Sequence, residues 1–215
     1  MAPDRGRFIT LEGGEGVGKS TLAAELASRL SRSGVDVVRT REPGGTPGAE
    51  AIRSLILTPP AEVAGWRPMA ETLLFYAARR DHLDKLIRPA LERGNWVICD
   101  RFSDSTRAYQ AAAGGVSAGD VEALDRICVG ETVPDLTLVL DLPIAIARQR
   151  MIARAGAADA IESRLLSYHE AVHRGFLEIA HANPHRCVVL DASVEPRALA
   201  DAAMQAIQMR LGGPG

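Results

Sequence analysis

Five short apolar runs alternate along the chain with longer segments that have helical periodicity. The runs are rich in β-branched residues and cover residues 7–12, 35–40, 95–100, 135–141 and 187–191. They are continuous rather than alternating, as in DLTLVLD at 135–141, which is typical of strands buried on both faces. The pattern therefore predicts an α/β fold with a five-stranded parallel sheet that helices cover on both sides.

The segments between these runs carry apolar residues at helical spacing. Leu22, Leu26 and Leu30 follow one another at i, i+4 and i+8, and Gly34 supplies a stop. By the same criteria we expect helices over residues 19–33, 49–57, 69–93, 103–115, 119–130, 143–154, 161–182 and 196–211. We find no internal repeat and no low-complexity linker, so residues 1–215 are expected to form one domain. Ligands of such a domain bind beyond the carboxyl ends of the strands.

Composition and charge exclude several classes of protein. The chain has 215 residues, of which 47% are hydrophobic and 24% charged, which is the balance of a globular domain. The net charge of −2 argues against a broad nucleic-acid-binding surface. We find neither a signal peptide nor an apolar run near the ~20 residues that span a bilayer, so no membrane contact is expected. The scattered Cys99, Cys128 and Cys187 fit free thiols in the cytoplasm rather than a metal site.

The segment GGEGVGKS at 13–20 matches the phosphate-binding pattern G-x-x-x-x-G-K-[ST]. A strand is expected before it and a helix after it, so backbone N–H groups and the helix N-terminus can surround phosphate oxygens. Lys19 is one of only two lysines among 25 Lys and Arg residues, which makes its presence here informative. We expect Lys19 to reach the β/γ-phosphates of ATP and Ser20 to hold Mg²⁺. The rest of the expected ATP loop comprises Gly13, Gly14, Glu15, Gly16, Val17, Gly18 and Thr21.

A phosphate-binding loop alone does not define the reaction. The chain has no NKxD motif of a GTPase and is short for an ATPase motor domain, so a small kinase with a lid fits better. Asp100 ends a predicted buried strand, where an acid can hold Mg²⁺ through water, although a helix cap is the alternative. Arg101, next to it, can face a phosphate or form a surface ion pair.

Four segments carry a more specific resemblance. LEGGEGVGKST, TREPGGTP, LLFYAARR and CDRFSDSTRAYQ occur in an order and spacing that resemble the thymidylate kinases of the bacterial type. The resemblance extends from about Phe8 to about Ile207. It implies a three-layer fold of the P-loop NTPase type with a short lid at about 148–162. It also implies transfer of the γ-phosphoryl group of ATP to dTMP with Mg²⁺, giving dTDP for dTTP synthesis.

The same resemblance assigns a pocket for dTMP. It implies that Phe75 stacks on thymine, that Arg79 binds a thymine carbonyl and that Tyr109 lies under the sugar. On helical spacing alone, Phe75 and Tyr109 would instead be core residues. The other residues that it brings to this pocket are Glu15, Pro43, Arg53, Arg101, Ser105, Thr106, Gln110 and Glu162.

Several of these assignments have simpler alternatives. Glu15 matches an acid near the dTMP 3′-hydroxyl and the metal, which would complete a metal set with Ser20 and Asp100. Arg53 matches a phosphate-binding arginine but can equally be an exposed helix charge. Glu162 can be a helix N-terminal charge that offsets the helix dipole.

Arginines of the expected lid are candidates for the phosphoryl-transfer step. Some family members have an arginine inside the phosphate loop, where this chain has Gly16, so the charge must come from elsewhere. We expect it from Arg154, with Arg150 second and Arg148 placed against adenine. Relatives often have an arginine where this chain has Ala160, so no role can be assigned at that position.

Two alternative functions remain open from the sequence. The chain could be another small P-loop kinase that acts on a different nucleotide or nucleoside, which TREPGG and STRAYQ argue against. It could also be a non-catalytic ATP-binding switch, which has no need of this set of arginines. The resemblance further implies a homodimer, for which residues 69–93 and 119–130 are the candidate helices.

Overall fold

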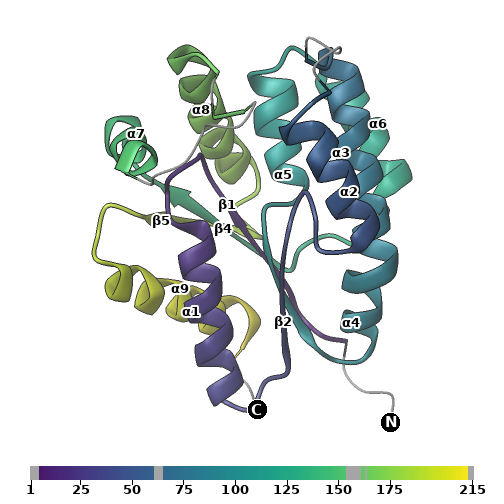
Figure 1. The fold of residues 1–215 in the computed structure, drawn as a ribbon. Coiled ribbons are helices and arrows are strands. Elements are labelled where there is room, and N and C mark those ends of the chain that lie inside the picture. Colours follow the sequence, from purple (N-terminus) through teal and green to yellow (C-terminus); the bar gives the residue numbers. More distant parts are fainter. Residues whose placement is uncertain (1–4, 61–64, 154–160, 163, 213–215) are drawn as a thin grey trace.

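The structure, a computed structural model, describes residues 5–60, 65–153, 161–162 and 164–212 (Figure 1). Five parallel strands form one sheet in the order β2-β3-β1-β4-β5. They are β1 (Phe8–Glu12), β2 (Val37–Arg41), β3 (Trp96–Asp100), β4 (Leu136–Asp141) and β5 (Cys187–Asp191). The predicted sheet is thus confirmed, and its central strand β1 leads directly into the phosphate-binding loop.

Helices cover both faces of this sheet, as the apolar runs predicted (Figure 1). One face packs against α1 (Lys19–Arg32) and α9 (Pro196–Leu211). The opposite face packs against α3 (Pro68–His82), α4 (Arg88–Glu92), α6 (Ala118–Cys128) and α8 (Leu166–Ala182). The remaining α-helices of the described residues are α2 (Pro47–Leu57), α5 (Ser103–Thr106) and α7 (Ile144–Ala153). None of the helices in these ranges is long and apolar enough to cross a bilayer.

Side-chain alternation decides where the acids at the carboxyl edge of the sheet point. In β1, Ile9 and Leu11 pack toward α1 and α9, whereas Phe8 packs into the core of the other face. Because successive side chains point to opposite faces, Glu12 shares the side of Phe8. Asp100 of β3 faces α1 instead, since its side chain reaches Ser20 at the start of that helix. The two acids therefore serve different sides of the site.

Two helical runs contain a wider π-helical turn that the periodicity does not reveal. The run predicted over residues 69–93 is continuous from α3 to α4, with a π-helical segment η1 at Leu83–Ile87. The run after α5 becomes π-helical at η2, Arg107–Ala112, and it carries Tyr109 and Gln110. Such turns often occur at functional sites, because they shift side chains out of regular register.

The helix predicted from residue 161 begins later than expected. Ile161 and Glu162 form a turn, and α8 starts at Leu166. Ile161 is buried, and Arg164 is held by Glu71 of α3. These contacts come from distant parts of the chain, so local periodicity gave the wrong starting residue.

Candidate active site

A cavity of about 380 Å³ lies above the phosphate-binding loop and the end of β3. Parallel sheets bind ligands at this edge, beyond the carboxyl ends of their strands. Most of the site residues expected from the sequence line it, namely Glu15, Gly16, Gly18, Lys19, Ser20, Thr21, Pro43, Arg53, Phe75, Arg79, Asp100, Arg101, Ser105, Thr106, Tyr109, Gln110, Arg150 and Glu162. Segments separated by more than 100 residues thus meet in one hollow.

The phosphate-binding loop needs glycine where the backbone turns. Gly16 has a φ of +72°, and a Cβ there would lie 2.5 Å from the carbonyl oxygen of Ala147. The loop wraps around Lys19, whose Nζ donates to the carbonyl oxygens of Gly13 at 3.1 Å and Gly14 at 2.6 Å. Burial, with the nearby Arg101 charge, lowers the pKa of Lys19 to about 8. The loop therefore holds a buried ammonium group ready for an anion.

Ser20 and Asp100 meet across the gap between α1 and β3. The Ser20 hydroxyl donates to Asp100 Oδ2 at 2.5 Å. A hydroxyl and a carboxylate are the hard oxygen ligands that Mg²⁺ takes beside substrate phosphates and water. The described residues contain no group of three or more His, Cys, Asp or Glu side chains placed to hold a metal ion. This arrangement fits a magnesium ion that is held mainly by nucleotide phosphates.

Arg101 contacts several walls of the cavity. Its backbone adopts a φ of +72°, which is rare for a residue with a side chain. Its guanidinium donates to Glu15 Oε1 at 2.6 Å, to the Gly13 carbonyl at 2.9 Å and to Ser105 Oγ at 3.2 Å. It also lies over the Tyr109 ring, 4.9 Å from the centroid. The surface ion pair considered from the sequence is therefore a cavity ion pair.

Arg79 forms the other charged end of the cavity. The side chain is 98% buried, and its Nε donates to Glu42 Oε2 at 2.7 Å. Its two terminal nitrogens donate to Thr106 Oγ1 at 3.0 Å and to the Phe102 carbonyl at 3.1 Å. Five donors in a rigid plane allow one arginine to hold three elements together.

Glu42 in turn has a second buried partner. Its Oε1 lies 3.1 Å from His82 Nδ1, and His82 Nε2 lies 2.7 Å from Thr40 Oγ1. Glu42 also precedes Pro43, and the peptide bond between them is cis. The Pro43 carbonyl accepts from Arg53 Nη1 at 2.9 Å, so Arg53 turns toward the cavity rather than outward.

The aromatic residues serve both the core and the cavity wall. Tyr109 is buried among Phe176 and Tyr168, and its hydroxyl donates to Glu15 at 3.2 Å. Phe75 is half-buried, packs against the same apolar cluster and lines the cavity. The core and the pocket interpretations of these side chains are thus compatible.

Gln110 lines the cavity and also binds a buried carboxylate. Its Nε2 donates to Glu71 Oε1 at 3.0 Å, while Glu71 Oε2 accepts from Arg164 Nη2. Tyr168 of α8 donates to the Tyr109 carbonyl at 2.9 Å. The segment after residue 160 is thereby joined to the helix that carries the pocket residues.

The described arginines of the expected lid differ in position. Arg150 lines the main cavity and also a second one, which lies between the phosphate-binding loop and α9. Its guanidinium lies 3.4 Å from the carbonyl of Ala192, in the turn after β5. Arg148 lines neither cavity. Arg154 and Ala160 lie outside the described residues.

Sequence reasoning missed four buried acids or bases around the site. They are Glu12, Glu42, Glu71 and His82. Glu12 had a visible signal, because an acid ends the otherwise apolar run FITLE directly before the phosphate-binding loop. The other three lie within helices or loops, where a buried charge looks like an exposed one.

The fold and this site together define a P-loop nucleoside monophosphate kinase. A family model described as Thymidylate kinase matches residues 11–202. The chain is 53% identical to a thymidylate kinase of Caulobacter vibrioides over 97% of this chain and 99% of that protein. It is 49% identical to one of Afipia carboxidovorans over 97% and 92% of the two chains.

A solved structure supports the same relationship. The crystal structure of thymidylate kinase from Ehrlichia chaffeensis matches with a TM-score of 0.76 at 33% identity, over 95% of this chain and 100% of that one. The chain therefore belongs to the thymidylate kinase family, the enzymes that phosphorylate dTMP to dTDP with ATP.

Proposed function

We propose that this chain binds ATP and dTMP at opposite sides of the main cavity and transfers the γ-phosphoryl group between them. The observation that carries this proposal is the position of Lys19 and Arg101, which line the same cavity from the phosphate-binding loop and from the end of β3. Phosphoryl transfer needs mainly alignment and neutralisation of charge. No general base is required, because the acceptor is already a phosphate oxyanion.

ATP occupies the phosphate-binding loop and the second cavity in this proposal. Backbone N–H groups of residues 13–18 and the start of α1 face its phosphates, with Lys19 as the cation. Adenine lies between the loop and α9, where Ala192, Val194 and Arg197 line the second cavity together with Arg150. Arg150, rather than Arg148, is the lid arginine that lines this cavity.

Mg²⁺ is held by Ser20 and, through water, by Asp100 in this scheme. The ion supplies neutralisation of charge on the transferring phosphoryl group. Glu15, which was also expected near the metal, accepts from Arg101 and Tyr109. We therefore assign Glu15 mainly to holding these two residues beside the sugar and phosphate of dTMP.

The acceptor nucleotide extends from Arg101 toward Arg79. Arg53, Arg101 and Ser105 form its phosphate end, since all three line the cavity with polar atoms. Thymine lies near Arg79 and Thr106, with Phe75 as the stacking surface and Gln110 and Glu162 at the wall. A single methyl group distinguishes thymine from uracil and is worth only about 1–3 kcal/mol in an apolar pocket. We therefore expect slower but measurable turnover of dUMP.

The moving phosphoryl group requires an arginine, and Gly16 leaves none in the loop. We assign this role to Arg154, with Arg150 as the second candidate because it lies beside Gly16 at the second cavity. A transition-state arginine contributes about 10³–10⁵-fold to the rate in related phosphoryl-transfer reactions.

A coupled ADP-release assay with ATP, Mg²⁺ and a panel of nucleoside monophosphates tests the proposal. We expect turnover mainly with dTMP, and a loss of about 10³-fold or more in Arg154→Ala with little change in the KM for dTMP. Arg148→Ala is the matched control, because this lid arginine lines neither cavity. ATP hydrolysis without an acceptor product would favour a switch, and preference for another acceptor would contradict the pocket assignment.

We also propose that the chain forms a homodimer through α2, α3 and α6. These helices lie side by side in Figure 1, and they expose Leu55, Met69, Leu73 and Ile127. Exposed apolar side chains on adjacent helices are candidates for burial against a second copy of the chain. A cytoplasmic location is proposed as well, because Cys99, Cys128 and Cys187 are all free thiols, as expected in a reducing compartment.

A further inference from the structure

Glu12 is fully buried at the end of β1 and does not line the cavity. We propose that Glu12 is a positioning residue for the acceptor phosphate, which fixes the turn that presents Arg101 and directs the Ser105 hydroxyl into the cavity. This inference rests on the proposed assignment of Arg101 and Ser105 to the phosphate of dTMP.

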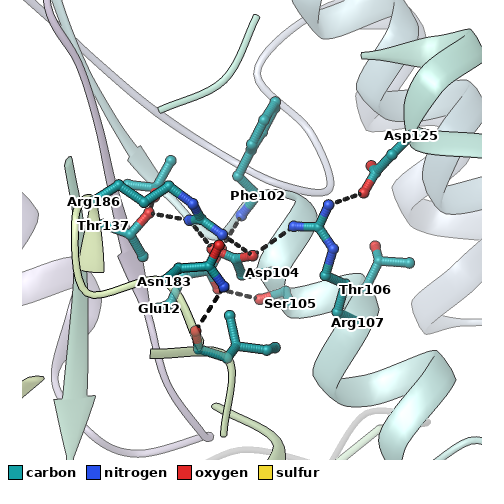
Figure 2. Close-up of polar contacts among 12 residues, drawn as sticks. Glu12, Phe102, Asp104, Ser105, Thr106, Arg107, Asp125, Thr137, Asn183 and Arg186 are labelled. Carbon is teal, nitrogen blue, oxygen red and sulfur yellow. Dashed lines mark hydrogen bonds and ion pairs between the residues drawn. The ribbon is translucent and has the colours of Figure 1, made fainter. Parts of the chain in front are cut away.

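The carboxyl group of Glu12 makes two contacts with the segment after β3 (Figure 2). Its Oε1 accepts from the backbone N–H of Phe102 at 2.7 Å. Its Oε2 lies 2.6 Å from Ser105 Oγ, and Ser105 does line the cavity. One buried side chain thus holds both a backbone amide and a pocket hydroxyl that are about 90 residues away in sequence.

These contacts flank a strained residue. Arg101 has a φ of +72°, and its N–H donates to the Leu11 carbonyl at 2.9 Å. The next amide, that of Phe102, has Glu12 as its partner, so two adjacent residues of β1 hold two adjacent amides of the turn. Without Glu12, the buried Phe102 N–H would lose that partner, and the unusual conformation of Arg101 would lose one of the hydrogen bonds that restrain the turn.

The backbone of Phe102 connects the two ends of the site. The Phe102 N–H binds Glu12, and the Phe102 carbonyl, in the next peptide unit, accepts from Arg79 at the base end at 3.1 Å. A displacement of Phe102 would therefore disturb the turn at Arg101 and the Arg79 contact together.

The protonation state of Glu12 determines what the Ser105 hydroxyl can do. Burial and the neighbouring Asp104 charge raise the pKa of Glu12 to about 8, against the opposing Arg101 charge. Lys19 of α1 and Arg186 beside β5 also face this carboxyl electrostatically. In this proposal the carboxyl holds a proton at neutral pH, so the contact in which Ser105 Oγ donates to Glu12 Oε2 reverses and the carboxyl donates to Ser105 Oγ. The Ser105 hydroxyl hydrogen is then available to a phosphate oxygen, whereas an ionised Glu12 would take it.

Asp104 maintains this state because it stays ionised. It lies between Arg186, at 2.6 Å and 3.0 Å, and Arg107, at 2.7 Å (Figure 2). These arginines lower the pKa of Asp104 in spite of its burial. The fixed negative charge beside Glu12 therefore favours its protonated form.

The test compares Glu12→Gln and Glu12→Leu across pH 6 to 9.5 at saturating ATP, which keeps Lys19 charged. Glutamine reproduces the protonated carboxyl, with an oxygen for Phe102 N–H and an amide for Ser105. We expect wild-type kcat/KM for dTMP to fall tenfold per pH unit above about pH 8 as Glu12 ionises. In Glu12→Gln this decline is absent. Glu12→Leu lowers kcat/KM for dTMP about 100-fold, as displacement of a reacting group by about 1 Å does, and leaves the KM for ATP unchanged.

Thermal unfolding provides a second readout if Glu12→Leu does not fold. Between pH 4.5 and about 8 the folded wild type binds more protons at Glu12 than the unfolded chain does, so this residue lowers stability as pH rises. Glutamine does not ionise, so Glu12→Gln lacks this pH-dependent contribution to stability. The Tm of Glu12→Gln minus that of the wild type should therefore grow from pH 5 to pH 8.

Two further variants separate the possible failures. Thr10→Val removes a buried hydrogen bond to Thr137 of 2.9 Å on the same face of β1, and should lower the Tm without changing the pH profile. Ser105→Ala should lower kcat/KM for dTMP at least tenfold at pH 7 and be insensitive to Glu12→Gln. Wild-type kinetics in Ser105→Ala would overturn the phosphate assignment and this inference with it. If Ser105→Ala lowers kcat/KM for dTMP but the pH profile of Glu12→Gln matches that of the wild type, the inference about Glu12 is overturned and the phosphate assignment stands.

Discussion

Charged side chains that line the cavity are paired with other groups of the protein. Arg101 is paired with Glu15, Arg79 with Glu42, and Lys19 with two loop carbonyls. Each anionic group that binds in the cavity therefore changes one of these pairings. Ordering a site before the substrate arrives reduces the entropy that binding must overcome.

The protonation of Lys19 on ATP binding can be measured directly. Its pKa of about 8 means that about half of the nucleotide-free protein carries a neutral Lys19 at pH 8. Polyphosphate binding favours the charged form, so ATP binding should take up about half a proton at pH 8 and little at pH 6.5. Calorimetry in buffers of different ionisation enthalpy measures this uptake. Lys19→Met should abolish it, and uptake that persists in that variant would assign the proton to another group.

Arg79 tests the base end of the pocket. Arg79→Lys keeps the charge but cannot hold Glu42, Thr106 and the Phe102 carbonyl at once. We expect kcat/KM for dTMP to fall about 100-fold through a misplaced pocket, with the KM for ATP unchanged. Arg80→Lys, on the exposed side of the same helix, is the control in steady-state kinetics. Equal effects of the two substitutions would argue against a specific role for Arg79.

The residues that sequence reasoning found and those that it missed differ in the range of their contacts. Lys19 and Ser20 belong to a local motif, so their environment follows from the next few residues. Glu12 and Glu71 act on partners about 90 residues away in sequence, Ser105 and Arg164, and only the folded chain brings these together. The resemblance supplied Arg101 and Ser105, but their dependence on Glu12 required the structure.

At the level of elements, a chain of ion pairs joins the helices behind the cavity to the sheet. Arg186, just before β5, binds Asp104 of α5, and Arg107 of η2 binds both Asp104 and Asp125 of α6 (Figure 2). Asp125 also accepts from the Tyr76 hydroxyl of α3 at 2.9 Å. This chain of ion pairs holds the segment that carries the proposed acceptor pocket, since α5 and η2 follow directly from Arg101.

Removing Arg186, one end of this chain of ion pairs, should therefore destabilise the protein strongly. Arg186→Met leaves Asp104 buried with one partner fewer, and we expect a loss of about 3 kcal/mol in the free energy of unfolding. Arg29→Met is the matched control, because its partners Glu25 and Asp201 are exposed and such pairs contribute about 0–1 kcal/mol. Urea unfolding of both variants measures the difference. Similar losses in the two would mean that Arg186 acts only as a surface residue does.

The elements themselves followed from the sequence to different degrees. Strands were predicted to within about two residues, because continuous apolar runs reflect burial on both faces directly. The π-helical turns at Leu83–Ile87 and Arg107–Ala112 were not predicted, since one additional residue in a turn leaves the apolar pattern nearly unchanged. The start of α8 was wrong because Arg164 binds Glu71, a contact that periodicity does not encode.

At the level of the whole molecule, the strand order explains how one loop can face both proposed nucleotide sites. β1 lies at the centre, with β3 on one side and β4 on the other. The loop after β1 therefore borders the proposed acceptor pocket next to β3 and the proposed donor cavity toward α9 at the same time. Helix α3 contributes residues both to the proposed acceptor pocket and to the exposed apolar positions of the proposed dimer.

The proposed dimer can be tested at the centre of that surface. Leu73 of α3 is 49% exposed and Ile127 of α6 is 71% exposed, so both gain burial if a second copy covers them. Leu73→Glu would place a charge in an apolar interface, and we expect sedimentation velocity to show a monomer in place of the wild-type dimer. Met209→Glu, at an equally apolar but distant position on α9, should leave the dimer intact. A wild-type monomer, or dissociation by Met209→Glu instead, would contradict this interface.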